Sequence, residues 1–383
     1  MNRVALITNL PPPYRIPIYN LLAQDPNVEF HAIFFSLREP NRSWDLPDIQ
    51  CHHHFLHERF ITYRGRYIHC NPDIISLLNK ISPDVIINDG FNPTHLLAFL
   101  YALIKKYPHI PMTDGTDSSE KKFSFLHKLI RKIVYKRSAS FISAALGGIR
   151  LYASYGIPKN LCFLSCLCVD NEKFQPNHIN AEKLFDFIFC SRLEKEKNPE
   201  FAIEVSRLTA TRLGRKCRLL IVGSGSLTSA LQRYARKYIN IVEVVFHGFA
   251  TQSELPTLYR SARLFLFPTQ ADVWGIVVNE ACAAGLPVIT TPYAGVVGEL
   301  VIHNENGYVV DLHEHVWADC AAKLLSNEHI YGLFSQHSLR LVAKYNFIAA
   351  ANGIKMAVQA ALKHSKKSSP SLIASSSVVK RSK

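Results

Sequence analysis

The sequence predicts an α/β protein built from two doubly wound, Rossmann-like domains. Its 383 residues exceed the usual length of a single domain. Short apolar segments typical of strands alternate with amphipathic helical segments, which favours parallel sheets covered by helices on both faces. The alternation occurs twice, with strands expected at 4–8, 30–35, 85–88 and 139–143 and then at 185–190, 219–222, 242–246, 264–267 and 288–291.

The domain limits follow from the point where the two runs meet. We expect an N-terminal domain over 1–170 and a C-terminal domain over 171–345. A helix is predicted at 346–362, and we expect it to pack back on the N-terminal domain. Residues 363–383 are rich in Ser and Lys, which predicts a disordered basic tail.

The composition indicates a folded protein with anionic partners. Hydrophobic residues make up 48% of the chain and charged residues 19%, as in packed globular proteins. A net charge of +14 attracts nucleic acid, anionic lipid headgroups or phosphorylated ligands, and charge alone does not choose among them. We do not expect nucleic acid as a partner, because the sequence shows no RNA- or DNA-binding motif.

Three features of the sequence favour a cytoplasmic protein. It contains no apolar stretch of about 18 residues, so no transmembrane helix is expected. The strand-like segment 4–8 follows the N-terminus directly, which argues against a signal peptide. The nine cysteines are odd in number and lack a disulfide framework, so free thiols in a reducing compartment are expected.

The first candidate site segment follows the strand predicted at 185–190. Arg192 and Lys197 lie at this strand end, where both can reach one diphosphate from two sides. An Arg fork and a Lys point charge are common partners of such a ligand. A solvated charged loop explains the same residues.

The second segment is a glycine-containing turn after the next strand. Gly223, Ser224 and Gly225 would let the backbone approach a ligand closely at a helix N-terminus. The full Gly-x-Gly-x-x-Gly pattern is absent because Thr228 takes the last position. A plain tight turn is an equally good interpretation.

The third segment places two carboxylates eight positions apart, Asp272 in a loop and Glu280 on the helix that follows. At different depths of one cleft they could bind different hydroxyls of a sugar nucleotide. At the helix start, the candidates for donor contact are Trp274, Gly275, Ile276 and Val277, three of them through backbone N–H groups that face an anion. The alternative is a helix capped by Asp272 with Glu280 half-buried.

These segments together resemble glycosyltransferase family four, the retaining group 1 glycosyltransferases with the GT-B fold. That family shows a Glu, seven residues and a second Glu, followed by Ala and a Gly-Leu-Pro-Val-Ile type strand. The matching positions here are Asp272, Glu280, Ala281 and 285–289, and 298–301 and 306–307 are similar too. The resemblance covers about 185–311 and extends weakly over the first half.

The resemblance implies a function for each candidate. Glu280 would bind the ribose hydroxyls and Asp272 the transferred sugar, while Arg192 and Lys197 would neutralise the leaving diphosphate. It implies a hexose-type transfer with retention, from a nucleotide diphosphate sugar to a glycan or lipid-linked acceptor in surface polysaccharide synthesis. It implies no metal and no cofactor. Asp272 departs from the family, since Glu is usual there, and its shorter side chain leaves donor identity and rate open.

The first half departs from the family as well. It lacks the Gly-Gly loop common after the first strand and has a proline-rich turn at 9–15. We expect this turn to direct Tyr14 and Arg15 toward the cleft, where Arg15 could bind an acceptor phosphate. Asp114, at an expected strand end, could orient the acceptor. Purely structural roles explain these three residues too.

Two further segments carry side chains that could bind a metal ion or a membrane. Consecutive histidines at 52–54, beside Cys51 and near His57, alternate between faces of a strand and so do not predict a metal site. Residues 121–143 carry basic and apolar side chains typical of a helix on a membrane surface, or of an ordinary surface helix. With the basic tail, this helix leads us to expect peripheral attachment to the cytoplasmic membrane face.

Other functions compete with glycosyl transfer. A sugar phosphorylase or nucleotide-sugar epimerase would share the fold and the phosphate-binding residues. A catalytically inactive, glycosyltransferase-like interaction protein would also fit, and the Asp272 substitution is the only feature of the sequence that hints at it.

Overall fold

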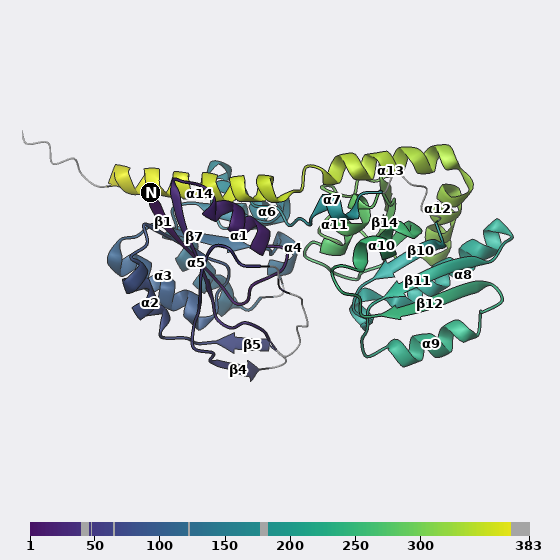
Figure 1. Ribbon diagram of the computed structural model, residues 1–383, viewed down its shortest axis with the longest axis horizontal. Coiled ribbons are helices and arrows are strands. Elements are labelled where there is room, and N and C mark those ends of the chain that lie inside the picture. The colour runs from purple at the N-terminus through teal and green to yellow at the C-terminus, as the bar shows by residue number, and fades with distance from the viewer. Residues whose placement is uncertain (40–45, 47, 64–65, 122, 177–182, 369–383) are drawn as a thin grey trace, which may run out of the picture.

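The structure is a computed structural model that describes residues 1–39, 46, 48–63, 66–121, 123–176 and 183–368. Two α/β domains lie beside each other, and the long helix α14 returns from the second to the first (Figure 1). Each domain has one parallel sheet between helices, which confirms the predicted fold class. Among the described helices, none is both long and apolar enough to cross a bilayer.

The N-terminal domain is built on a seven-stranded parallel sheet in the order β3-β2-β1-β6-β7-β8-β9. Its strands are β1 Asn2–Thr8, β2 Val28–Phe34, β3 His52–Phe55, β6 Val85–Asn88, β7 His109–Thr113, β8 Phe141–Ser143 and β9 Cys162–Leu164. Its helices are α1 Ile16–Ala23, α2 Ile74–Ile81, α3 Pro93–Lys105, α4 Asp117–Glu120, α5 Phe125–Lys136 and α6 Leu146–Ser154, with the 3-10 helix η1 Lys159–Leu161. The central strands are buried on both faces, which explains their continuous apolar sequence.

The strand ranges expected from the sequence do not include the outer strands β3 and β9 of this domain. The histidine-rich segment forms the edge strand β3, where the His54 Nε2 atom lies 3.1 Å from His31 Nδ1 on β2. An antiparallel hairpin, β4 Phe60–Tyr63 and β5 Arg66–His69, follows it. Exposed and polar side chains on β3 hide the apolar alternation by which a strand is recognised.

The C-terminal domain is built on a six-stranded parallel sheet in the order β12-β11-β10-β13-β14-β15. Its strands are β10 Phe185–Cys190, β11 Cys217–Val222, β12 Val242–Gly248, β13 Ala262–Phe267, β14 Val288–Thr290 and β15 Gly307–Val309. Its helices are α7 Asn171–Phe174, α8 Pro199–Leu213, α9 Thr228–Arg236, α10 Leu255–Arg260, α11 Ile276–Ala283, α12 Glu314–Ser326 and α13 Glu328–Val342, with the 3-10 helix η2 Lys195–Lys197. Parallel pairing brings the carboxyl ends of β10, β11 and β13 to one edge.

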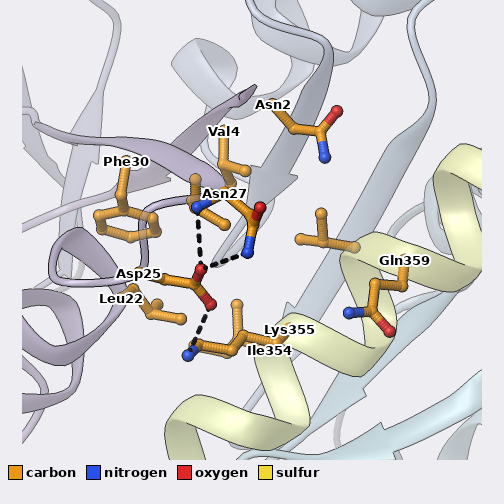
Figure 2. Close-up of a pocket in the computed structure, with 11 residues that line it drawn as sticks. Asn2, Val4, Leu22, Asp25, Asn27, Phe30, Ile354, Lys355 and Gln359 are labelled. Carbon is orange, nitrogen blue, oxygen red and sulfur yellow. Dashed lines mark hydrogen bonds and ion pairs between the residues drawn. The ribbon is translucent and has the colours of Figure 1, made fainter.

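Helix α14, Phe347–Ser368, crosses to the N-terminal domain and packs against α1 and the sheet (Figure 1). A Cβ atom on Gly353 would lie 1.6 Å from the Leu164 carbonyl oxygen, so this glycine permits the close approach. An ion pair of 2.8 Å joins Lys355 to Asp25 beside a cavity of about 140 Å³ (Figure 2). The helix runs past residue 362, where the tail was predicted to begin; the tail from 369 onward lies outside the described residues.

The two domains meet in a shared apolar cluster. Ala145 and Leu167 of the N-terminal domain belong to the same buried cluster as Trp274 and Val278 of the C-terminal domain. A polar contact adds to it, because both carboxylate oxygens of Glu299 accept from the backbone N–H of Leu146, each at 3.0 Å. This contact places the side-chain carboxylate of Glu299, a residue of the C-terminal domain, at the N-terminus of helix α6.

Candidate functional site

Lys197 and Asp272 form the centre of the candidate site. Lys197 ends the 3-10 helix η2 after β10, and Asp272 lies in the loop after the neighbouring strand β13. The Lys197 Nζ atom lies 2.6 Å from Asp272 Oδ2, and the two side chains are 14% and 19% exposed. A backbone hydrogen bond of 2.9 Å, from Gln270 N–H to the Glu196 carbonyl, ties the two loops together. Two of the predicted catalytic residues are thus in direct contact.

Glu280 is held by a different partner. It lies in the second turn of α11, where its Oε2 atom accepts a 2.8 Å hydrogen bond from the Tyr259 hydroxyl. Its side chain is buried, 5% exposed. Burial raises the pKa of Glu280 to about 7, against the opposing effect of the Tyr259 hydrogen bond. The carboxyl group therefore changes its charge near neutral pH. Tyr259 was not predicted, because no motif in the sequence points to it.

Arg192 lies in the same loop as Lys197 but in a different environment. Its side chain is 71% exposed, and its Nη2 atom makes a weak 3.4 Å contact with Glu196 Oε1. An exposed, weakly paired guanidinium can swing toward a ligand at little cost. Of the two residues predicted to bind the diphosphate, Lys197 is therefore held in place by its ion pair and Arg192 is only loosely held.

The glycines at 223 and 225 allow two loops of the chain to approach each other. Gly223 has φ +130°, and a Cβ atom there would lie 2.0 Å from the Ser191 carbonyl oxygen. A Cβ atom on Gly225 would lie 2.5 Å from the Leu193 carbonyl oxygen. The Leu193 N–H donates to the Ser224 carbonyl at 3.0 Å. The sequence predicts that the backbone of this turn lies close to a ligand. In the structure it lies close to the loop that carries Arg192.

The start of α11 corrects one donor candidate. The Trp274 side chain is 1% exposed, and its Nε1–H donates to Asn279 Oδ1 at 2.8 Å inside the interdomain cluster, so this ring does not face a ligand. Gly275 precedes the helix with φ +106°, and Ile276 and Val277 form its first turn. The Trp274 backbone N–H donates to Asp272 Oδ1 at 3.2 Å. Asp272 thus stabilises the loop before α11, but it does not cap the helix as the alternative interpretation expected, because the N-cap is Gly275 and receives no side-chain hydrogen bond.

Arg15 is buried and paired within the protein, whereas the sequence led us to expect it to point toward the cleft. Its side chain is 1% exposed and donates to the Ser165 carbonyl at 3.0 Å and to Asp114 Oδ1 at 2.8 Å. The physical reason is that two partners lie beside its guanidinium group. Asp114, after β7, supplies a carboxylate, and Ser165, after β9, supplies a backbone carbonyl. Asp114 is 33% exposed and held by this contact. Tyr14 is half-buried against the interdomain cluster.

Asp89 joins Asp114 at the carboxyl edge of the N-terminal sheet. It follows β6, the strand between β1 and β7, and accepts a 3.2 Å hydrogen bond from the Thr8 hydroxyl. Burial and the nearby Asp114 raise the pKa of Asp89 to about 7, and Arg15 opposes this rise. Sequence reasoning missed Asp89 as a site residue, although its position directly after a buried strand was the available signal.

Part of the chain is similar to a known protein family. The model of the family "Glycosyl transferases group 1" matches residues 170–340, the segment that holds Lys197, Asp272 and Glu280. Residues 170–340 form a group 1 glycosyltransferase domain.

Curated relatives of the chain carry similar names. The putative colanic acid biosynthesis glycosyltransferase WcaL of Escherichia coli is 30% identical over 162 residues, 40% of this chain and 39% of that protein. The D-inositol 3-phosphate glycosyltransferase of Corynebacterium glutamicum is 28% identical over 169 residues, 43% of this chain and 40% of that protein. The matched region thus spans well under half of these relatives.

Solved structures resemble the whole chain. Anabaena HepE in complex with UDP has a TM-score of 0.72 at 13% identity, over 94% of this chain and 100% of that chain. Sucrose-phosphate synthase from Thermosynechococcus elongatus has a TM-score of 0.67 at 15% identity, over 94% of this chain and 98% of that chain. These similarities establish the GT-B fold, with two Rossmann-like domains facing each other.

Proposed function

We propose that this protein is a metal-independent glycosyltransferase that transfers a hexose-type sugar from a nucleotide diphosphate donor to a glycan or lipid-linked acceptor, with retention, in surface polysaccharide synthesis. The observation that carries the proposal is the contact of Lys197 with Asp272 at the carboxyl edge of the C-terminal sheet. In an open α/β sheet, ligands bind at this edge. HepE, a GT-B protein of similar fold, has been solved with UDP and with UDP-glucose, which supports a donor of this class.

The ion pair suggests how the donor is received. Lys197 and Asp272 form an ion pair with each other. On donor binding, the ammonium group would turn to the diphosphate, and Asp272 would accept hydrogen bonds from the sugar. Arg192 is exposed and able to close on the same diphosphate. Glu280 would hold the ribose hydroxyls through the carboxyl group that Tyr259 positions.

In the transfer step, the bond between the anomeric carbon and the diphosphate oxygen breaks. The acceptor oxygen bonds to the anomeric carbon on the same face, and its proton passes to a donor phosphate oxygen. Charge develops on the leaving diphosphate, where Lys197 and Arg192 would stabilise it. Positive side chains at this point supply the stabilisation that a metal ion supplies in other transferases.

On the acceptor side, Asp114 is the group we assign to acceptor binding. It is partly exposed and is fixed by the buried Arg15, which acts as a positioning residue. A carboxylate held in this way can accept a hydrogen bond from an acceptor hydroxyl. We further propose that the protein works at the cytoplasmic membrane face, where a lipid-linked acceptor would be found.

A panel of nucleotide sugars tests this function. Thermal unfolding would be followed with UDP-, GDP- and ADP-sugars, because a ligand that binds the native state raises the melting temperature by mass action. The donor that stabilises the protein is then incubated with acceptors, and product formation is compared with and without inorganic phosphate. Transfer without phosphate supports the proposal, and strict phosphate dependence would indicate a phosphorylase. Donor binding without turnover would indicate an inactive, interaction-type protein.

A further inference from the structure

The outward face of helix α5 is unusually apolar. Val134 and Tyr135 point inward and are buried, as expected for a helix that covers a sheet. On the opposite side, Phe125 is 81% exposed, Leu126 63%, Leu129 40% and Ile133 44%. Spacings of one, three and four residues bring these side chains to one side of the helix. A surface helix normally presents polar side chains there.

Basic residues flank this apolar stripe. Within α5 the charged side chains are Lys128, Arg131, Lys132 and Lys136, and Arg137 caps the helix. Arg131 serves the fold, because its guanidinium lies 4.2 Å from the Phe123 ring centroid and 4.6 Å from that of Phe91. The others are available to an anionic surface, and α5 contains no acidic residue.

Helix α3 extends the same surface. α3 and α5 follow successive parallel strands, β6 and β7, so right-handed crossovers put both on one side of the sheet. Phe99 of α3 packs in one cluster with Val134 and Tyr135 of α5, which makes the helices neighbours. Outward on α3, Ile104 is 78% exposed and Leu100 50%. We call the outward sides of these two helices the α3–α5 face.

We propose that the α3–α5 face docks on an anionic lipid bilayer, with its apolar side chains inserted among the headgroups and its lysines against lipid phosphates. Charge selects this occupant, since exposed apolar side chains alone would suit a protein partner as well. The proposal deepens the proposed function by naming the surface at which the protein would meet a lipid-linked acceptor. Only the identity of that acceptor rests on the proposed function.

The geometry relates this face to the candidate site. Asp114 follows β7, and α5 begins eleven residues later at Phe125. Because α5 runs back along the sheet in a crossover between β7 and β8, its N-terminal end lies at the edge where β7 ends. The two most exposed apolar residues of α5, Phe125 and Leu126, therefore lie at the Asp114 end of the helix.

Flotation of the full chain with vesicles tests the proposal. Vesicles of phosphatidylcholine alone would be compared with vesicles that also contain phosphatidylglycerol, at low and at high salt. We expect the protein to float with the anionic vesicles, and high salt should weaken this binding without abolishing it because part of the affinity is apolar. The variant Phe125→Ser/Leu126→Ser should lower the bound fraction about tenfold.

A matched control removes two apolar side chains from another helix. Ile348 and Met356 on α14 are 65% and 54% exposed, so Ile348→Ser/Met356→Ser should float as the unchanged protein does. Equal flotation of all three proteins, complete release by salt, or no flotation would overturn the proposal. Loss of a dimer in the Phe125→Ser/Leu126→Ser variant, seen by light scattering, would instead assign the face to a second copy. The flotation experiment uses no nucleotide sugar, so its failure would not affect the proposed function. Thermal stabilisation by the donor tests that function separately.

Discussion

The Lys197 Nζ atom lies 2.6 Å from Asp272 Oδ2, and this contact joins two loops that follow neighbouring strands. Neither side chain is fully buried, so each can exchange its partner for a ligand without leaving an isolated charge in the core. The family usually has Glu at the position of Asp272. With the shorter side chain of Asp272, the carboxylate still contacts Lys197. The pair therefore presents one positive and one negative group side by side at the candidate site.

Replacing Lys197 should remove most of the transfer activity. We expect Lys197→Ala to lower kcat/KM by about 5- to 150-fold, equivalent to about one to three kcal/mol for a lost charged contact. The melting temperature should change little because Lys197 lies in a loop-end 3-10 helix. Lys195→Ala is the matched control, since Lys195 is exposed two residues earlier in η2. Normal turnover in Lys197→Ala would refute the donor site.

The charge of Glu280 should make donor affinity depend on pH. Its pKa is raised from 4.5 to about 7, so the protein without donor holds this group protonated below neutral pH. An ionised carboxylate is the better acceptor for ribose hydroxyls. We therefore expect the Kd of the sugar nucleotide to fall as pH rises from about 6 to 8, measured by calorimetry. In Glu280→Gln the Kd should be weaker and nearly flat over this range.

Glu280 should also make the stability of the protein depend on pH. As pH rises, donor affinity should increase, whereas the stabilising contribution of Glu280 should decrease. Because the folded pKa of Glu280 lies above its unfolded value, its contribution to stability is complete below about pH 4.5 and is lost as pH rises through about 7. Glu280→Gln cannot ionise. Its free energy of unfolding relative to the unchanged protein should therefore increase between about pH 5 and 8, measured by urea denaturation. A constant difference would show that Glu280 ionises normally in the fold.

The local sequence could predict the part of the site that depends on strand ends. Lys197 and Asp272 were placed together by one rule, that parallel strands end at a common edge, and the structure brings them into contact. The burial of Arg15 and Trp274 was not predicted because it depends on residues distant in sequence. Arg15 bonds to Ser165, 150 residues away, and Trp274 packs in a cluster from both domains. Such packing leaves no periodic trace in a single sequence.

Chelation of metals should leave transfer intact. Lys197 and Arg192 provide positive charge at the predicted diphosphate position, and among the described residues no group of three or more metal-ligating side chains gathers in one place. Activity in excess EDTA should therefore equal that of the untreated protein, measured by release of the nucleoside diphosphate. Complete loss with recovery on adding magnesium or manganese would contradict metal-independent transfer.

A methyl group at position 223 should loosen the loop that carries Arg192. The Cβ atom of Gly223→Ala would lie 2.0 Å from the Ser191 carbonyl oxygen, and φ there is +130°. We expect a loss of about 2 kcal/mol or more in the free energy of unfolding. Gly156→Ala is a suitable control, since Gly156 also has positive φ, +80°, but open space around it. Similar losses in both variants would mean that backbone strain, and not the contact between the loops, explains the glycine.

Asp114 should act on the acceptor and leave the donor unaffected. Its carboxylate accepts a 2.8 Å hydrogen bond from the buried Arg15 and is 33% exposed, so it is both fixed and accessible. Asp114→Asn keeps the shape but replaces one acceptor oxygen by a donor and weakens the contact with Arg15. We expect kcat/KM for the acceptor to fall about tenfold or more, while donor-induced thermal stabilisation is unchanged. Asp117→Asn is the control, because Asp117 is 39% exposed and pairs with Arg150 on the surface. If Asp114→Asn weakened donor binding and acceptor use in equal measure, or altered neither, Asp114 would have a structural role only.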